Sequence, residues 1–155
     1  MGLFAMNRSR QSFLSVRAAV MRPSGGPLKI ERLKMEGPRD DEVLVRLTAS
    51  GICHTDIDFC DGGASGPVVL GHEGAGVAER VGKKVKGMKP DDHVVLSCQS
   101  CGHCPACRNH HPADGPHFWE VNFGFARLDG SNAFQGDVRG HFFGLSSFAT
   151  HTLAT

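Results

Sequence analysis

The sequence predicts a mainly β fold with short helices, built as a sandwich or a barrel. Three β-prone segments, at residues 18–22, 28–35 and 42–48, are separated by turns that contain glycine and proline. Strands that follow one another without long helices between them favour an antiparallel sandwich or barrel over alternating β-α units. The chain has 155 residues, of which 40% are hydrophobic, and this is enough for one domain with its own core.

The elements can be predicted in order from the N-terminus. Residues 1–17 contain three arginines, three serines and no acidic residue, a composition shared by transit peptides and disordered extensions, and we expect a disordered extension. In 28–35, apolar residues alternate with charged ones, with one slip that predicts a β-bulge. Residues 53–60 suit a short helix, and 116–140 a long loop packed by its aromatic side chains. Further strands are expected at 68–70, 74–81, 93–96 and 145–153.

The charge and the cysteine content narrow the classes of function. A formal net charge of +1 gives no electrostatic basis for binding nucleic acid or an anionic membrane, and no apolar run approaches the length that spans a bilayer. Four of the six cysteines fall at 98–107. This crowding favours metal binding in a reducing compartment such as the cytoplasm over a disulfide framework.

Two short motifs predict a metal centre. Residues 51–56 read Gly-Ile-Cys-His-Thr-Asp, and residues 71–73 read Gly-His-Glu. The thiolate of Cys53 and the imidazole of His72 are ligand types that zinc prefers. Each residue alone has a plainer explanation. A lone cysteine is usually a small buried hydrophobic residue, and a lone histidine is usually hydrogen-bonded in the core or at the surface. The two motifs together favour metal binding.

A second candidate site is the cysteine-rich lobe, residues 98–115. Repeated Cys-x-x-Cys is a strong metal signal, because two thiolates of one turn can point at the same ion. Two alternatives stay open: the thiols are reduced and bind nothing, or the run with Pro105 ligates an iron–sulfur cluster, from whose usual spacing it departs. The cysteines of the lobe are Cys98, Cys101, Cys104 and Cys107.

Several motifs in order carry a family resemblance. They are residues 51–56, the run Gly-His-Glu-Gly-Ala-Gly-Val at 71–77, Val-Lys-Gly-Met-Lys-Pro-Asp-Asp-His-Val at 85–94, and Cys-Gly-His-Cys-Pro-Ala-Cys at 101–107. From about Arg17 onward the chain resembles the N-terminal half of zinc-dependent medium-chain alcohol dehydrogenases. Its segments 122–124 and 141–149 resemble the aryl-alcohol (benzyl-alcohol) branch. The resemblance implies a GroES-like irregular β barrel over residues 18–155, including the cysteine-rich lobe.

The resemblance implies roles for the residues of both short motifs. Cys53 and His72 would be two of the three protein ligands of a catalytic zinc, whose open fourth position binds an alcohol and favours loss of its proton. Hydride then passes to NAD(P), and the alcohol becomes an aldehyde. Thr55 would accept the alcohol proton and start a relay to water. Glu73 would be a transient ligand or an electrostatic tuner of the metal.

Three more residues receive roles in the same way. Asp56 would orient His72 through its second ring nitrogen, His54 would face the cofactor pyrophosphate, and Phe142 would line the substrate pocket. Plainer alternatives stay open here too. Thr55 and Asp56 could cap a helix, and Phe142 and Phe143 could belong to the core.

In the family, the lobe holds a structural zinc through three cysteines, which match Cys101, Cys104 and Cys107, and a fourth ligand eight residues later. That position is Gly115, which has no side chain to ligate. Cys98 could substitute, or Asp114 or His111 could supply oxygen or nitrogen. Otherwise the lobe binds no zinc stably, because metal binding and local folding are coupled.

Members of the family also have parts that have no counterpart in this sequence. The third catalytic ligand, a cysteine, and the Rossmann domain of the family have no counterpart in residues 1–155. We therefore expect a fragment that is inactive or nearly so alone and that binds NAD(P) only with that domain. The expected partners are a small-molecule alcohol or aldehyde, and a missing C-terminal half or further copies of the chain. The competing hypothesis is a non-catalytic, stand-alone zinc-binding GroES-like module that acts with another chain.

Overall fold

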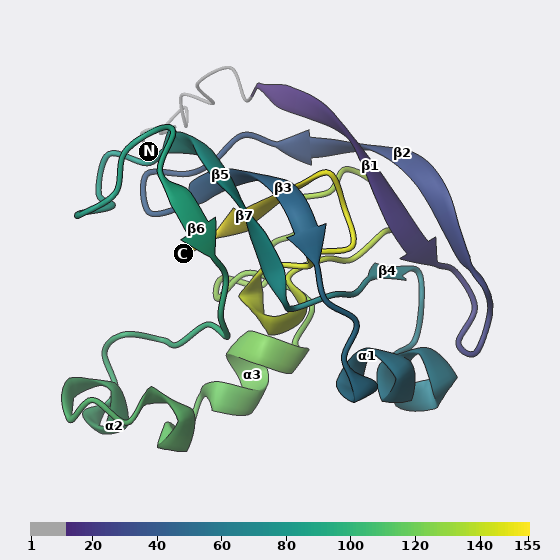
Figure 1. The fold of residues 1–155 in the computed structure, drawn as a ribbon. Coiled ribbons are helices and arrows are strands. Elements are labelled where there is room, and N and C mark those ends of the chain that lie inside the picture. The colour runs from purple at the N-terminus through teal and green to yellow at the C-terminus, as the bar shows by residue number, and fades with distance from the viewer. Residues whose placement is uncertain (1–11) are drawn as a thin grey trace, which may run out of the picture.

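Two antiparallel sheets form the framework of the protein, whose computed structural model describes residues 12–155 (Figure 1). The first sheet has the order β2-β1-β4 and consists of β1 (Phe13–Met21), β2 (Leu28–Glu36) and β4 (Val68–Val69). The second has the order β6-β5-β3-β7 and consists of β3 (Val43–Ser50), β5 (Gly74–Val81), β6 (His93–Val95) and β7 (His151–Ala154). The mainly β class is confirmed, but the two sheets do not close into a complete barrel.

The segment 148–150 joins the two sheets. The Thr150 amide donates to the carbonyl of Arg17 on β1 (2.8 Å), and the Thr150 carbonyl accepts from the amide of Leu47 on β3 (3.0 Å). This crossing places side chains of both sheets in one core. Its buried members include Val16, Val20, Leu33, Leu44 and Leu153.

The predicted bulge in β2 is wrong. The register between β1 and β2 is continuous along both strands. Without an extra residue, Leu33 and Met35 point into the core, whereas Ile30 lies on the opposite face, where it is 73% exposed. The register shifts occur on β3 instead, where it pairs with β5.

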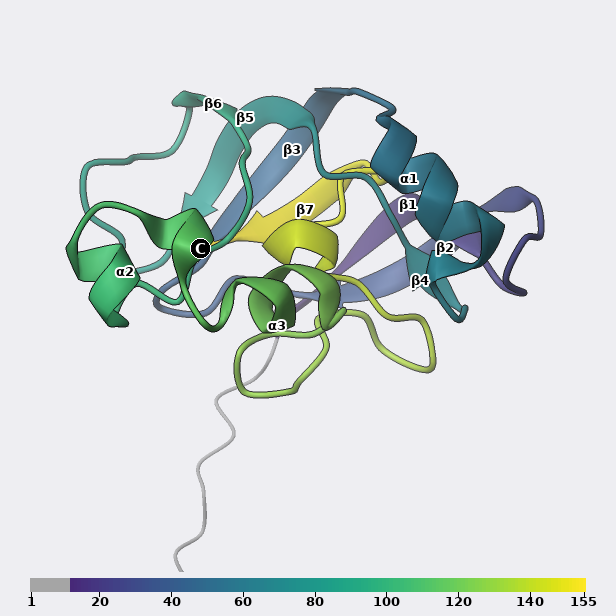
Figure 2. The same cartoon turned by 90° about the horizontal axis from the view of Figure 1, so that it is seen from below.

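Short helices gather at one end of the sheets (Figure 1). They are α1 (His54–Asp58), the π-helical turn η1 (Phe59–Gly63), α2 (Pro105–Arg108), η2 (Pro112–Asp114), α3 (Phe118–Phe123) and η3 (Phe142–Gly144). Figure 2 looks onto this end and shows α3 close to η3. The helix predicted at 53–60 is confirmed by α1 and η1. Two predictions need correction, because α3 lies within the predicted loop and the expected last strand at 145–153 is extended only from His151.

The N-terminal boundary also differs from the prediction. Strand β1 begins at Phe13, inside the segment 1–17 that was expected to be an extension, and it pairs with β2 over its whole length. The rest of that prediction falls on residues 1–11, outside the described residues. Within 12–155, no helix combines the length and the apolar content needed to cross a bilayer.

A buried ion-pair cluster attaches the loop after α3 to the sheets. The guanidinium of Arg127 donates to both carboxylate oxygens of Glu42 and, at 2.8 Å, to Glu36. His141 lies beside this cluster and borders the same cavity of about 190 Å³ as Arg127 and Glu42. It is buried, and within the described part of the chain its Nε2 has no hydrogen-bond partner. Burial and the nearby charge of Arg127 lower the pKa of His141 to about 4.

Candidate metal centre

The two short motifs meet where α1 begins and β5 begins. Cys53 immediately precedes α1, and His72 and Glu73 lie in the turn between β4 and β5. One potential ligand atom from each of these residues lies within 4.8 Å of the other two. Sulfur, nitrogen and carboxylate oxygen are the three donor types found in zinc sites, so this group fits a zinc-class ion.

Asp56 fixes the relative positions of the two motifs. Its carboxylate accepts from the amide of Cys53 (2.9 Å) and the amide of Gly71 (3.0 Å), and its Oδ1 lies 3.2 Å from His72 Nδ1. Asp56 is 1% exposed, so its charge is compensated by these donors rather than by water. With Nδ1 directed at the carboxylate, Nε2 is the nitrogen of His72 that remains for a metal.

Two glycines make this approach possible. A Cβ at position 71 would lie 2.4 Å from Phe148 Cδ1, and the φ of Gly71 is +86°, in the left-handed region that L side chains rarely adopt. A Cβ at position 51 would lie 3.1 Å from Glu73 Cβ and closer still to its carboxylate. Gly71 is therefore needed where the backbone brings His72 to Cys53, and Gly51 leaves room for the side chain of Glu73.

Thr55 and His54 differ in how close they lie to the centre. The half-buried Thr55 places its Oγ1 3.7 Å from the Sγ of Cys53. His54 points away, with a side chain that is 85% exposed and lies 3.6 Å from Asp58 Oδ1. The structure thus brings Thr55 to the centre and leaves His54 at the surface.

The aromatic neighbours of His72 change the expected role of Phe142. Phe142 is 0% exposed and belongs to a buried cluster with Met21 and Leu70, so it is a core residue rather than the wall of an open pocket. Its ring meets His72 edge-on at 5.6 Å between centroids. The half-buried Phe143 instead stacks on the imidazole at 4.3 Å with an interplanar angle of 20°.

The cysteine-rich lobe forms a second group of donors. The Sγ of Cys107 lies 3.4 Å from that of Cys104 and 3.8 Å from that of Cys101, and all three lie within 4.8 Å of one another. Two thiolates of a tetrahedral zinc site are about 3.8 Å apart, since each Zn–S bond is about 2.3 Å. The backbone amides of His103 and Cys104 are the main donors that lower the pKa of Cys101 to about 6.

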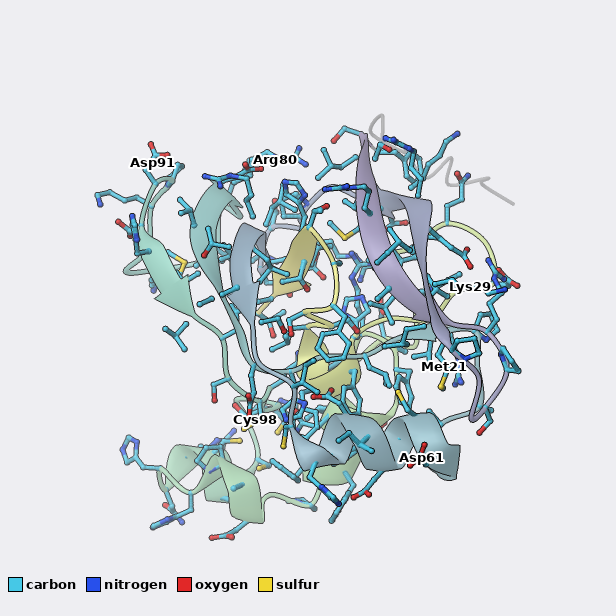
Figure 3. All side chains as sticks on the ribbon, turned by 45° about the vertical axis from the view of Figure 1, so that its right-hand side comes forward. Met21, Lys29, Asp61, Arg80, Asp91 and Cys98 are labelled. Carbon is cyan, nitrogen blue, oxygen red and sulfur yellow. The ribbon has the colours of Figure 1, made fainter. Side chains whose placement is uncertain are left out.

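No side chain completes this second group in the described part of the chain. Cys98 is exposed on the segment that leads from β6 toward the lobe (Figure 3). Neither Cys98 nor His111 nor Asp114 joins the three cysteines within 4.8 Å. Gly115 does face the group, because a Cβ there would lie 3.1 Å from Cys104 Sγ. The lobe therefore offers three donors, one fewer than a structural zinc site usually has.

Comparison with known proteins identifies the family of the chain. Residues 39–150 match the family described as the alcohol dehydrogenase GroES-like domain. The chain belongs to this family. The resemblance to the N-terminal half of zinc-dependent alcohol dehydrogenases is thereby confirmed.

Relatives of this alcohol dehydrogenase GroES-like domain match nearly all of it. The geraniol dehydrogenase of Castellaniella defragrans is 47% identical over 149 residues, which are 93% of this chain and 40% of that protein. An alcohol dehydrogenase zinc-binding domain protein from Burkholderia ambifaria superposes with a TM-score of 0.89 at 46% identity, covering 92% of this chain and 40% of that one. For the benzyl alcohol dehydrogenase of Acinetobacter calcoaceticus the TM-score is 0.87 at 40% identity, with 91% and 39% covered. The chain thus spans about 40% of the length of these relatives.

Sequence reasoning missed two features of this alcohol dehydrogenase GroES-like domain. The sequence suggests only a core position for Phe143, whereas the helical turn η3 bends at this residue (φ +53°) and its ring stacks on His72. Trp119 was expected to pack within a loop, yet it is 71% exposed and stacks on Phe123 from the surface of α3. Trp119 and Phe123 stand four residues apart, as on one face of a helix, but a single pair does not establish a helical period.

Proposed function

We propose that this chain supplies the zinc-binding catalytic part of an NAD(P)-dependent alcohol dehydrogenase that oxidises a primary or aryl alcohol to its aldehyde. The observation that carries the proposal is the convergence of Cys53, His72 and Glu73, with Asp56 behind the imidazole. The relatives named for geraniol and benzyl alcohol support this class of substrate.

Each polar residue of the centre has a task in this proposal. Cys53 Sγ and His72 Nε2 would hold the zinc, which, when bound, supplies the Lewis acidity that favours loss of the alcohol proton. Asp56 holds the His72 proton on Nδ1 and so keeps Nε2 free. Thr55, whose hydroxyl both accepts and donates, would take the proton of the alcohol and pass it to water. Glu73 adds a negative charge at the exposed side of the centre.

The surroundings of His72 suit a flat, apolar substrate. Phe143 stacks on the imidazole, and Phe123 meets Phe143 edge-on at 4.9 Å between centroids. Both rings are half-buried, so they present apolar area on the side of His72 where Phe143 stacks. We infer that Phe143 takes the pocket-lining role first assigned to Phe142.

The reaction also requires a nicotinamide cofactor. Every ladder between named strands of residues 12–155 is antiparallel, whereas the usual dinucleotide cradle is a parallel βαβ unit. We infer that NAD(P) binds to a separate nucleotide-binding domain, with the exposed His54 facing its pyrophosphate. All six cysteines are free thiols, which supports a reducing compartment, the cytoplasm, as the site of action.

The test is a fusion of residues 1–155 to the remaining part of the geraniol dehydrogenase from Castellaniella defragrans. We expect reduction of NAD or NADP with geraniol or benzyl alcohol, and loss of this activity with a zinc chelator. His72→Ala should abolish it, while the matched change His93→Ala, at an exposed histidine of β6, should not. A folded, zinc-loaded fusion without alcohol oxidation, or activity that survives His72→Ala, would refute the proposal.

A further inference from the structure

His141 has a polar atom that is buried and unpaired. The residue is only 5% exposed, and within residues 12–155 its Nε2 has no hydrogen-bond partner. A buried polar group without a partner has lost its hydration and gained no hydrogen bond in return, so folded proteins contain few such groups. The unpaired Nε2 therefore indicates a place where a further molecule completes the structure.

The cavity that His141 borders has room for such a molecule. Its volume is about 190 Å³. In another protein a cavity of about 150 Å³ holds benzene, so this cavity can hold a molecule of about six heavy atoms. Leu128 and Leu153 supply apolar parts of its wall. The cavity is separate from the candidate metal centre, since neither Cys53 nor His72 lines it.

The charged side chains of the cavity wall compensate one another. Arg127 donates to both carboxylate oxygens of Glu42. Arg39 forms an ion pair with Asp129, at 2.7 Å between Nη1 and Oδ2. Asp41 also lines the cavity, but it is exposed, so water solvates its carboxylate. Because each arginine of the wall already has its carboxylate partner, the cavity favours a neutral molecule over an ion.

The remaining polar groups of the wall suit hydroxyl groups. The pKa of His141, about 4, keeps the imidazole neutral at pH 7, and a neutral imidazole has one donor and one acceptor nitrogen. A hydroxyl both donates and accepts, so it can pair with Nε2 in either tautomer. Gln99 Nε2 donates to Thr155 Oγ1 at 2.7 Å. This bond leaves the amide oxygen of Gln99 to accept from a second hydroxyl and the hydroxyl hydrogen of Thr155 to donate to one.

We propose that this cavity binds a small neutral molecule with at least two hydroxyl groups, one paired with His141 Nε2 and another with Gln99. The carbon chain of such a diol packs on the leucines of the wall. His141 and Gly144, which stand at the two ends of η3, both line the cavity. Phe143 of the same turn stacks on His72, so a bound diol contacts the segment that carries this ring.

The test follows the imidazole nitrogens of the whole chain by NMR at pH 7, after labelling of histidine with ¹⁵N. The His141→Asn variant identifies the signals of His141 by their absence. The probe is 1,4-butanediol, and the matched control is benzene, which has the same number of heavy atoms and no hydroxyl. We expect butanediol to shift the Nε2 signal of His141 with half-saturation on the order of 1–10 mM, and benzene to cause no saturable shift.

A substitution and a second histidine locate the bound diol. Gln99→Met keeps the length of the side chain without its amide, so it should raise the half-saturation concentration about tenfold, the effect of one lost hydrogen bond. His93, exposed on β6, should show no saturable shift. The proposal is overturned if His141 does not respond to butanediol up to about 100 mM, which would leave water as the occupant. It is equally overturned if benzene or His93 gives the same saturable shift, or if Gln99→Met binds butanediol unchanged.

Discussion

His141 should make the stability of the protein depend on pH in a measurable way. Its buried imidazole has a pKa of about 4, because burial and the charge of Arg127 disfavour the protonated form more than Glu42 favours it. An imidazole in the unfolded chain titrates near 6.5. Between these values the unfolded state binds more protons than the folded state, so the free energy of unfolding must fall as the pH falls. Integrated from pH 7 to pH 5, this linkage corresponds to about 2 kcal/mol.

The assay is urea unfolding followed by circular dichroism at several pH values between 7 and 5. His141→Asn is the matched variant, since asparagine tolerates the left-handed backbone at this position (φ +61°) and does not titrate. We expect the free energy of unfolding of the unchanged chain to fall by about 2 kcal/mol more than that of His141→Asn over this range. Equal pH dependence of the two proteins would refute the argument that His141 is held neutral.

Three further predictions concern the metal centre and the buried groups of the framework. Asp56→Asn should weaken zinc binding about 10- to 100-fold without unfolding the chain, because the carboxylate partner of His72 is lost; competition with a chromogenic chelator measures this. Arg127→Met should lower the free energy of unfolding by about 3–5 kcal/mol, since it leaves Glu42 buried without its partner, and the added change Glu42→Gln should recover part of that loss in urea melts. Gly71→Ala should lower the thermal midpoint, because its Cβ has no room and its φ is positive; differential scanning calorimetry would show no change if that backbone can relax.

The strands were predictable wherever both ends of a strand carried a signal. Strand β5 begins at Gly74 and ends at Val81 as expected, because its run of small and apolar residues is bounded by glycine-containing turns. Alternation could not reveal which apolar residues of β2 face the core, since Ile30 and Leu33 lie on opposite faces of a regular strand. The helix α3 was missed because its six residues are too few to show a clear period.

The sequence predicts more about the centre at Cys53 and His72 than about the cysteine-rich lobe. Cys53 and His72 could be predicted as candidate ligands because ligand chemistry depends on residue type, and the structure brings the two side chains together. Only the family resemblance suggests that Asp56 orients the imidazole of His72. The structure shows the contacts of the Asp56 carboxylate with the amides of Cys53 and Gly71 and with His72 Nδ1. The direction in which Gly115 faces could not be predicted, since a glycine has no side chain whose pattern could indicate it.

The most direct test of the central claim is the zinc content per chain, measured by elemental analysis after gentle purification. The account predicts that Cys53→Ser lowers the content by about one ion, and that Cys104→Ser lowers it separately by about one. Zinc content that is unaffected by Cys53→Ser would contradict the assignment of a metal centre at Cys53 and His72. Iron in place of zinc would contradict the assignment of both sites.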